Sequence, residues 1–197
     1  AATLWLLRCQ VGAEEIVTLP TRAGVTQSYF LTSMPKQLQA IAILFPGSGG
    51  TIQLRTEGGQ PRFATGNFLV RSRVEFVKRG VIAAIVDAPS DMQGGWGMSD
   101  EFRLGTEHAV DMNAVIEDLQ KRLPNTPIFL IGTSRGTISA AALSARLKQP
   151  IAGTVLTATM FRPTRRQSKE PGPGLSKFDI ATIKVPVLFA HHVSDQC

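Results

Sequence analysis

Three continuous apolar runs constrain the fold of this chain more than any other feature. They are IAILF at residues 41–45, VIAAIV at residues 81–86 and IFLI at residues 128–131. Short apolar runs bounded by turn residues are typical of strands that are buried on both faces of a parallel sheet. Four further strands are predicted, at residues 15–19, 27–31, 151–156 and 185–190.

Helical periodicity separates these runs. In residues 106–123, apolar residues recur three and four positions apart, and Pro124 ends the pattern. Further helices are predicted over residues 68–78 and from Gly136 to about residue 148. Strands that alternate with helices predict the α/β class, with a mostly parallel sheet flanked by helices. In such sheets ligands bind at the carboxyl ends of the strands.

Composition favours a globular protein of one domain. The chain has 197 residues, of which 43% are hydrophobic and 18% are charged. Its formal net charge is +6, but the basic residues are scattered and are not interleaved with aromatic ones, so nucleic-acid binding is not expected. One short basic cluster, which could attract anionic substrates or could simply be solvated, comprises Arg162, Arg165, Arg166 and Lys169.

The first thirteen residues resemble a targeting segment. Residues 1–7 are apolar but too few to span a membrane, and the small residues before Glu14 resemble a signal-peptidase site. We therefore expect residues 1–13 to be the remnant of a secretory signal and residues 14–197 to form the domain. This places the protein outside the cell or in the periplasm. The alternative is a buried first strand or helix in a cytoplasmic protein.

The two cysteines do not form a metal-binding pattern. Cys9 lies in the expected signal, and Cys197 would then be a single cysteine, either unpaired or paired with a partner outside the chain. No Cys or His spacing of the zinc-binding kind occurs, so no metal and no cofactor are expected. The oligomeric state is left open.

The sequence GTSRG at residues 132–136 carries the strongest chemical signal. It matches the pattern G-x-S-x-G, with a predicted buried strand before it and a predicted helix after it. This arrangement sets a serine on a sharp bend, and glycines suit the two outer positions because larger side chains would clash across the turn. Ser134 is therefore the candidate nucleophile. The alternative is a glycine turn that only begins a helix.

Two backbone N–H groups are candidates for binding an oxyanion. Arg135 begins the helix after Ser134, where its N–H can face developing negative charge. The second donor is expected from the glycine-rich loop PGSGG at residues 46–50, and we assign it to the Ser48 N–H. A phosphate-binding loop is the alternative, but this loop matches neither of the usual phosphate patterns.

These residues together resemble the α/β-hydrolase superfamily over nearly all of the chain after about residue 14. The likeness is to small exported hydrolases and, more distantly, to dienelactone hydrolases. Two positions depart from the common pattern, because Pro46 stands where many members have His and the pair His191-His192 stands where His-Gly is common. The segments that carry the resemblance are residues 44–50, 86–91, 132–136 and 185–195.

The resemblance implies a triad in the order serine, acid, histidine. Three acidic residues follow Ser134, and Asp195 matches the acid position of the family, after the last predicted strand. Glu170 lies in the basic loop, and Asp179 precedes the strand at its wrong end. Asp87 ends an earlier strand and is interpreted as a carboxylate that caps a loop.

The histidine of the triad has no counterpart after Asp195. We expect the base to lie beyond residue 197, together with a last strand and helix, so that residues 1–197 alone would have little activity. A triad of Ser134, Asp179 and His192 is the formal alternative. His108 is interpreted as a surface or boundary residue of its helix.

The expected function is that of a serine hydrolase acting on a carboxylic ester or a related acyl bond of a small molecule. Other reactions on the same fold, by a thioesterase, peptidase or lyase, are alternatives within enzymes. The alternative outside enzymes is a binding protein, which would keep the same bend as part of its scaffold but would not catalyse a reaction.

Overall fold

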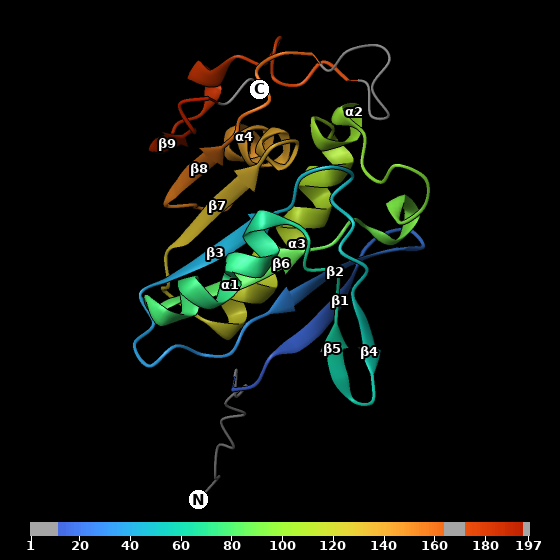
Figure 1. Cartoon of the computed structure of the whole chain (residues 1–197), viewed down its shortest axis with the longest axis vertical. Coiled ribbons are helices and arrows are strands. Elements are labelled where there is room, and N and C mark those ends of the chain that lie inside the picture. Colours follow the sequence, from blue (N-terminus) through green and yellow to red (C-terminus); the bar gives the residue numbers. More distant parts are fainter. Residues whose placement is uncertain (1–11, 164–171, 195–197) are drawn as a thin grey trace, which may run out of the picture.

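A computed structural model describes residues 12–163 and 172–194 of the chain. Its centre is a seven-stranded sheet in the order β1-β2-β6-β3-β7-β8-β9. The first two strands pair antiparallel, and β6, β3, β7, β8 and β9 run parallel to one another. In Figure 1 the arrows of β3, β7 and β8 accordingly point the same way. The predicted α/β class with a mostly parallel sheet is confirmed.

The elements follow the alternation expected from the apolar runs. The strands of the large sheet are β1 (Glu15–Arg22), β2 (Val25–Leu31), β3 (Ala40–Phe45), β6 (Val81–Val86), β7 (Ile128–Thr133), β8 (Gly153–Thr157) and β9 (Val187–Ala190). The helices are α1 (Phe68–Lys78), α2 (Asp100–Arg103), α3 (Thr106–Arg122) and α4 (Gly136–Arg146), with short 3-10 turns η1 (Ser90–Met92) and η2 (Ile180–Thr182).

Helices cover both faces of the sheet. Along β3, Ile41 and Ile43 face a core that also contains residues of α3 and α4, whereas Ala42 and Leu44 face a second core with α1. The side chains of β3 are buried on both faces because successive residues of a strand point to opposite sides. This explains the continuous apolar runs in the sequence. It also leaves the carboxyl ends of the parallel strands as the place where loops can gather.

Sequence periodicity missed the hairpin formed by β4 (Arg55–Glu57) and β5 (Gln60–Arg62). Its strands are polar and mostly exposed, so they carry no alternation of buried and exposed residues. The Gly58-Gly59 turn was the available signal, since both glycines have positive φ values (57° and 75°), as a two-residue turn of type I′ requires. The four-residue helix α2 was also missed, because it is too short to show a period.

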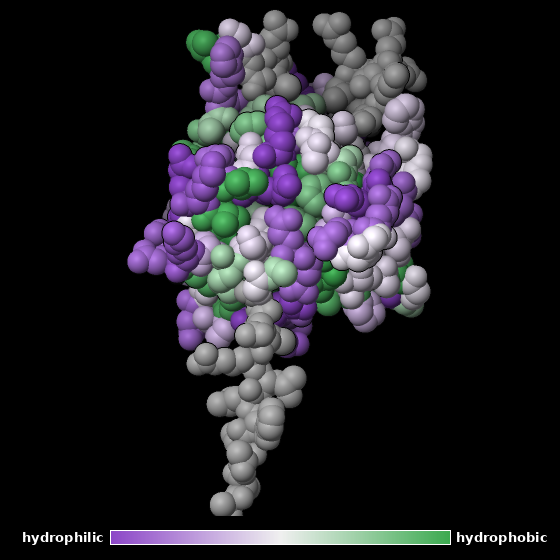
Figure 2. Space-filling view, turned by 60° about the horizontal axis from the view of Figure 1, so that its bottom comes forward, coloured by the Kyte–Doolittle hydropathy of each residue, from purple (hydrophilic) through white to green (hydrophobic). Residues whose placement is uncertain are grey.

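The last strand of the described sheet is more exposed than its sequence predicts. Leu188 and Phe189 of β9 are 59% and 42% exposed, because β9 lies at the edge of the sheet formed by residues 12–163 and 172–194. Elsewhere the surface is mixed, and on the face in Figure 2 hydrophilic residues lie between the hydrophobic ones. Within residues 12–163 and 172–194, no helix is both long and apolar enough to cross a membrane.

Candidate active site

Ser134 lies on a tight bend between β7 and α4. Its φ is 51°, in the left-handed region that residues other than glycine rarely adopt. Its backbone N–H binds the carbonyl of Thr157 on β8 at 3.0 Å, and its carbonyl accepts hydrogen bonds from the N–H and hydroxyl of Thr137. Strain of this kind costs roughly 1–3 kcal/mol and persists only where neighbours fix it, as these bonds do. The side chain remains partly exposed.

The two glycines of GTSRG are needed for close packing, as the sequence predicted. A Cβ on Gly136 would overlap the carbonyl oxygen of Phe45 at the end of β3. A Cβ on Gly132 would overlap the backbone of Gly136 across the turn. The bend therefore lies directly against the neighbouring central strand, with no room for a side chain at either position.

The loop at residues 46–50 comes next to Ser134. The nearest atom to a Cβ built on Gly47 would be the Cβ of Ser134, at 3.1 Å. Ser48 follows with a φ of 50° and an exposed side chain. Within residues 12–163 and 172–194, no protein acceptor binds the Ser48 N–H. Ser134 and Ser48, which the sequence predicted to share a site, are thus brought together.

Asp87 holds the chain that follows this loop. Its carboxylate is buried and accepts hydrogen bonds from the N–H groups of Ile52 (2.7 Å), Leu54 (2.9 Å) and Ala88 (2.9 Å). The prediction that Asp87 caps a loop is therefore confirmed. Three backbone donors that would otherwise be unsatisfied are bound by one side chain.

The loop from β6 to α2 covers the other side of the glycine-rich loop. Met98 donates its N–H to the carbonyl of Gly49 at 2.9 Å, and Gly97 lies against Gly49 so closely that neither position can accept a Cβ. Trp96, next to this contact, is 62% exposed. The loop therefore fixes the backbone near Ser48 and presents a large apolar side chain beside it.

A network that the sequence did not predict centres on α2. Arg103 is fully buried and donates to the carbonyl of Ser48 and to the hydroxyl of Ser139, both at 2.8 Å. Asp100, also buried, forms an ion pair with the Arg135 side chain and accepts the N–H of Gly174 at 2.9 Å. No sequence period marks these residues; the only local signal was Ser99, whose hydroxyl caps α2.

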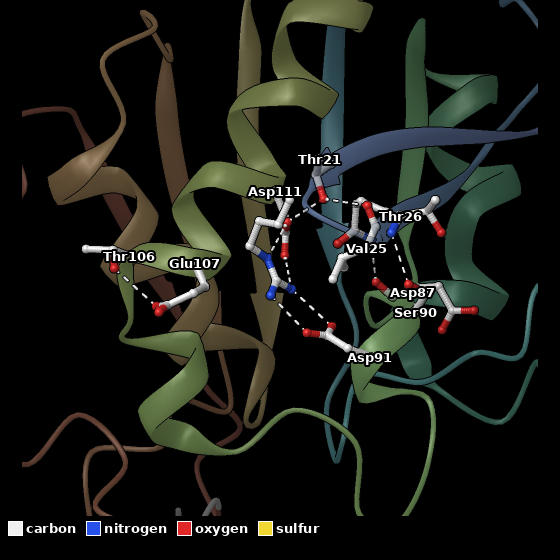
Figure 3. A network of polar contacts seen from close by, with 11 residues as sticks. Thr21, Val25, Thr26, Asp87, Ser90, Asp91, Thr106, Glu107 and Asp111 are labelled. Atoms are coloured by element: carbon white, nitrogen blue, oxygen red, sulfur yellow. Dashed lines mark hydrogen bonds and ion pairs between the residues drawn. The ribbon is translucent and has the colours of Figure 1, made fainter.

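A second polar network closes the same end of the molecule. Figure 3 shows the side chains of Asp91 and Asp111 turned toward one point. The guanidinium of Arg22 binds both carboxylates, at 2.8 Å and 2.9 Å. Thr21 also donates to Asp111 at 2.6 Å. Hydrogen bonding to Asp111 and then to Asp91 raises the pKa of Arg22. The network ties the β1–β2 turn to η1 and α3.

The prediction for His108 is wrong. The side chain is 1% exposed, and its ring lies near the rings of Phe45 and Phe102, with centroid distances of 6.1 Å and 5.5 Å. Helical spacing explains this, because His108 lies one turn before the buried Met112 on the same face of α3. Burial, followed by the charges of Arg103 and Arg22, lowers the pKa of His108 to about 3. The ring is therefore neutral and belongs to the core.

The other two histidines follow β9. The Nε2 of His191 lies 3.0 Å from the hydroxyl of Thr159, and its ring stacks on Phe161. The Nδ1 of His192 accepts the N–H of Ser194 at 3.1 Å. These contacts hold both rings beside their own strand.

The structure describes one of the three acidic candidates that follow Ser134. Asp179 is exposed and caps η2 by accepting the N–H of Ala181, before β9 begins. Asp195 and Glu170 lie outside the described residues, as do Arg165, Arg166, Lys169 and both cysteines. The expected signal segment lies outside them too, except at Gly12 and Ala13. The role predicted for Asp195 therefore stays a prediction.

The described side chains suggest no metal site. Within residues 12–163 and 172–194, no group of three or more His, Cys, Asp or Glu residues could hold a metal ion. The site consists of a serine hydroxyl, backbone N–H groups and buried polar side chains that fix them.

Solved structures with the same fold include several esterases. An esterase from an Arctic intertidal metagenomic library is 16% identical, with a TM-score of 0.59, and the match covers 90% of this chain and 71% of that one. A lidless α/β serine hydrolase from Xanthomonas campestris is 17% identical, with a TM-score of 0.54 and coverage of 91% and 83%. A thermostable carboxyl esterase from Bacillus coagulans is 16% identical, with a TM-score of 0.54. That match covers 75% of this chain but only 44% of the esterase, so the chain spans less than half of its length.

Sequence comparison gives the family. No curated protein matches the chain significantly. Residues 77–194, more than half of the chain, match the family described as serine aminopeptidase, S33. The sheet order and the bend at Ser134 agree with this assignment. The chain belongs to this family, within the α/β-hydrolase superfamily.

Proposed function

We propose that the protein is a serine hydrolase that cleaves a carboxylic ester or a related acyl bond, with Ser134 as nucleophile. The observation that carries the proposal is the position of Ser134 at a bend with positive φ, beside the loop of Ser48. A serine hydroxyl held clear of a sheet at such a bend is accessible to substrate. Membership of a hydrolase family supports the same reaction class.

In the proposed reaction, the Ser134 Oγ attacks the carbonyl carbon of the acyl group. A histidine takes the hydroxyl proton, and the carbonyl oxygen becomes an oxyanion that the N–H groups of Ser48 and Arg135 stabilise. The histidine then returns the proton to the departing alcohol or amine, and an acyl-enzyme remains. Water, activated by the same histidine, hydrolyses this intermediate and regenerates Ser134.

The base and the acid of the triad are part of this proposal. Asp195 is proposed to orient the base, as the resemblance to the superfamily implies. We propose, from the same resemblance, that the base is a histidine outside residues 1–197; within the described residues, His108 lies in the core. We therefore expect the product of the complete reading frame to turn over esters and residues 1–197 alone to do so at least 1000-fold more slowly, because triad members act as a unit.

A fluorophosphonate probe tests the nucleophile directly. It should label the complete protein on Ser134, and labelling should disappear in Ser134→Ala but persist in Ser144→Ala, a serine on the far part of α4. Absence of labelling in the wild type, or labelling that survives Ser134→Ala, would refute the proposal. A protein that only binds ligands on this fold would give the former result.

A peptidase is the second candidate, because the matching family is described as a serine aminopeptidase. The substrate classes can be separated by comparing p-nitrophenyl acyl esters with aminoacyl p-nitroanilides. The proposed esterase should cleave only the esters efficiently. A higher kcat/KM for the anilides would favour the peptidase.

Export of the protein is also a proposal. It depends on the resemblance of residues 1–13 to a signal segment. N-terminal sequencing of protein recovered from the medium or periplasm should begin at Glu14. A protein that begins before this residue would contradict the proposed cleavage.

A further inference from the structure

The short helix α2 contains two charged residues that are buried beside the candidate site. Arg103 is 0% exposed and Asp100 is 1% exposed. Charged side chains are almost never buried to this extent unless they make specific interactions. Here those interactions lead to Ser48 and Arg135, the two residues whose N–H groups are proposed to bind the oxyanion.

Arg103 contacts the glycine-rich loop from the side opposite to solvent. One end of its guanidinium donates to the Ser48 carbonyl at 2.8 Å, and the other donates to the Ser139 hydroxyl of α4 at the same distance. The group also fills the space next to Gly50, where an added Cβ would lie 2.9 Å from Nη2. Because the planar guanidinium is bound at both ends, it holds the Ser48 carbonyl in one orientation.

Fixing this carbonyl also fixes the residue to which it belongs. Ser48 has a φ of 50°, in the left-handed region that residues other than glycine rarely adopt. The next carbonyl, that of Gly49, is held by the Met98 N–H, and that of Gly47 accepts the Gly50 N–H at 3.1 Å. Three consecutive carbonyls are thus bound, while the Ser48 N–H has no acceptor in the described part of the chain.

Asp100 acts in the same way on the other donor. It pairs with the side chain of Arg135, the residue that follows Ser134, and it also binds the Gly174 N–H. The four residues of α2 therefore connect the glycine-rich loop with the start of α4. A shift of α2 would move both proposed donors relative to each other.

We propose that Arg103 is a positioning residue for the oxyanion site: by binding the Ser48 carbonyl it fixes the backbone at Ser48, so that the N–H of the same residue faces the reacting carbonyl of the substrate. This inference rests on the proposed function. Arg103 does not touch the substrate, and it acts only through Ser48. Its effect should therefore appear in the transition state, where the oxyanion develops, and not in the binding of the ground-state substrate.

The test compares Arg103→Lys and Arg103→Met in the complete protein. Lysine keeps one charged donor but cannot bind both Ser48 and Ser139, so it should retain part of the function. We expect kcat to fall about 10-fold in Arg103→Lys and about 100-fold in Arg103→Met, with KM changed less than about twofold. Affinity for a trifluoromethyl ketone, which forms an oxyanion on Ser134, should fall by the same factors as kcat.

Tyr29→Phe provides a control for general loss of stability. Tyr29 is buried on β2 and binds Asp118 at 2.5 Å, away from Ser48. This variant should lower the melting temperature without changing kcat or the affinity for the ketone. If Arg103→Lys behaves like Tyr29→Phe, or if its KM rises while kcat is unchanged, Arg103 is structural and the proposal is overturned.

Amide hydrogen exchange separates this proposal from the proposed function, because it requires no activity; it compares the wild type with Arg103→Lys and Tyr29→Phe. Exchange of the Gly50 N–H, which binds the Gly47 carbonyl at 3.1 Å, should be at least 10-fold faster in Arg103→Lys than in the wild type, and unchanged in Tyr29→Phe. Equal exchange in all three proteins would overturn the positioning role even if the enzyme is active. If exchange responds as expected but the wild type is not labelled by a fluorophosphonate, it is the hydrolase assignment that fails.

Discussion

The carboxylate of Asp87 binds the backbone N–H of Ile52 at 2.7 Å, joining residues 35 positions apart in the sequence. The same side chain binds the N–H groups of Leu54 and Ala88. The end of β6 thereby fixes the course of the chain that leaves the glycine-rich loop. An acid that could have been mistaken for a catalytic group is thus fully used in holding backbone.

Replacement of Asp87 by Ala should destabilise the fold strongly. It leaves buried N–H groups without acceptors, and we expect a loss of about 3 kcal/mol in the free energy of unfolding. Urea denaturation measures this change. Glu57→Ala, which removes an exposed carboxylate from the β4–β5 hairpin, should leave the midpoint unchanged. An Asp87→Ala midpoint equal to that of the wild type would show that the loop holds itself.

The two carboxylates that bind Arg22 should contribute unequally. Asp111 is fully buried and also accepts the Thr21 hydroxyl, whereas the Asp91 side chain is 34% exposed. We expect Asp111→Ala to cost about 3 kcal/mol and Asp91→Ala less than about 1 kcal/mol, because solvent screens the exposed pair. Denaturation of both variants at low and high salt provides the measurement. A larger loss in Asp91→Ala would contradict the interpretation.

Gly136→Ala should prevent the bend at Ser134 from packing against β3. The added Cβ would overlap the Phe45 carbonyl, and the backbone cannot yield without moving a central strand. We expect a loss of at least 1–3 kcal/mol, read as a lower melting temperature. Gly66→Ala is the matched control, because a Cβ there meets nothing within 4 Å. Equal stability of the two variants would argue against the packing of the bend.

His108→Leu should stabilise the protein at neutral pH. The imidazole is buried, and neither ring nitrogen has a hydrogen-bond partner in the described part of the chain. Replacing it with an apolar side chain of similar size removes an unsatisfied polar group, which is worth roughly 1–3 kcal/mol. The free energy of unfolding at about pH 7 should rise accordingly. A decrease would indicate that the ring is bound to water or to another group.

The same residue predicts a pH dependence of stability. Because the pKa of His108 is lowered to about 3 in the folded protein, the unfolded chain takes up the proton first as pH falls below its ordinary value. The contribution of His108 to the free energy of unfolding should therefore be constant above about pH 6.5. Between about pH 6.5 and pH 3, the free energy of unfolding should fall by up to about 1.4 kcal/mol per pH unit. His108→Leu should lack this contribution, so the difference in the free energy of unfolding between the variant and the wild type should increase as the pH falls.

Much of the fold could be predicted because its signals are local. The apolar runs at β3, β6 and β7 and the helix spacing of α3 recur at fixed short intervals, so they identify elements without knowledge of the neighbours. The weakest signals came from short polar elements. The β4–β5 hairpin and α2 have no buried face long enough to produce a period.

The residues of the candidate site also differ in whether a local sequence signal predicted them. Ser134 and the glycines around it were predictable, since the bend uses consecutive residues. The loop of residues 46–50 lies beside it because neighbouring parallel strands end at the same edge of the sheet. His108 was misjudged, because its polarity outweighed a spacing that already placed it on the buried face of α3.

The sequence by itself determined the alternation of the strands of the large sheet with α1, α3 and α4, and the sharp bend at Ser134. The tertiary structure alone decided what holds this site in place. Arg103 and Ser48 are 55 residues apart, and Asp100 and Arg135 are 35 apart. Contacts at such separations leave no periodic pattern in the chain, because they exist only after the sheet has brought the two segments together.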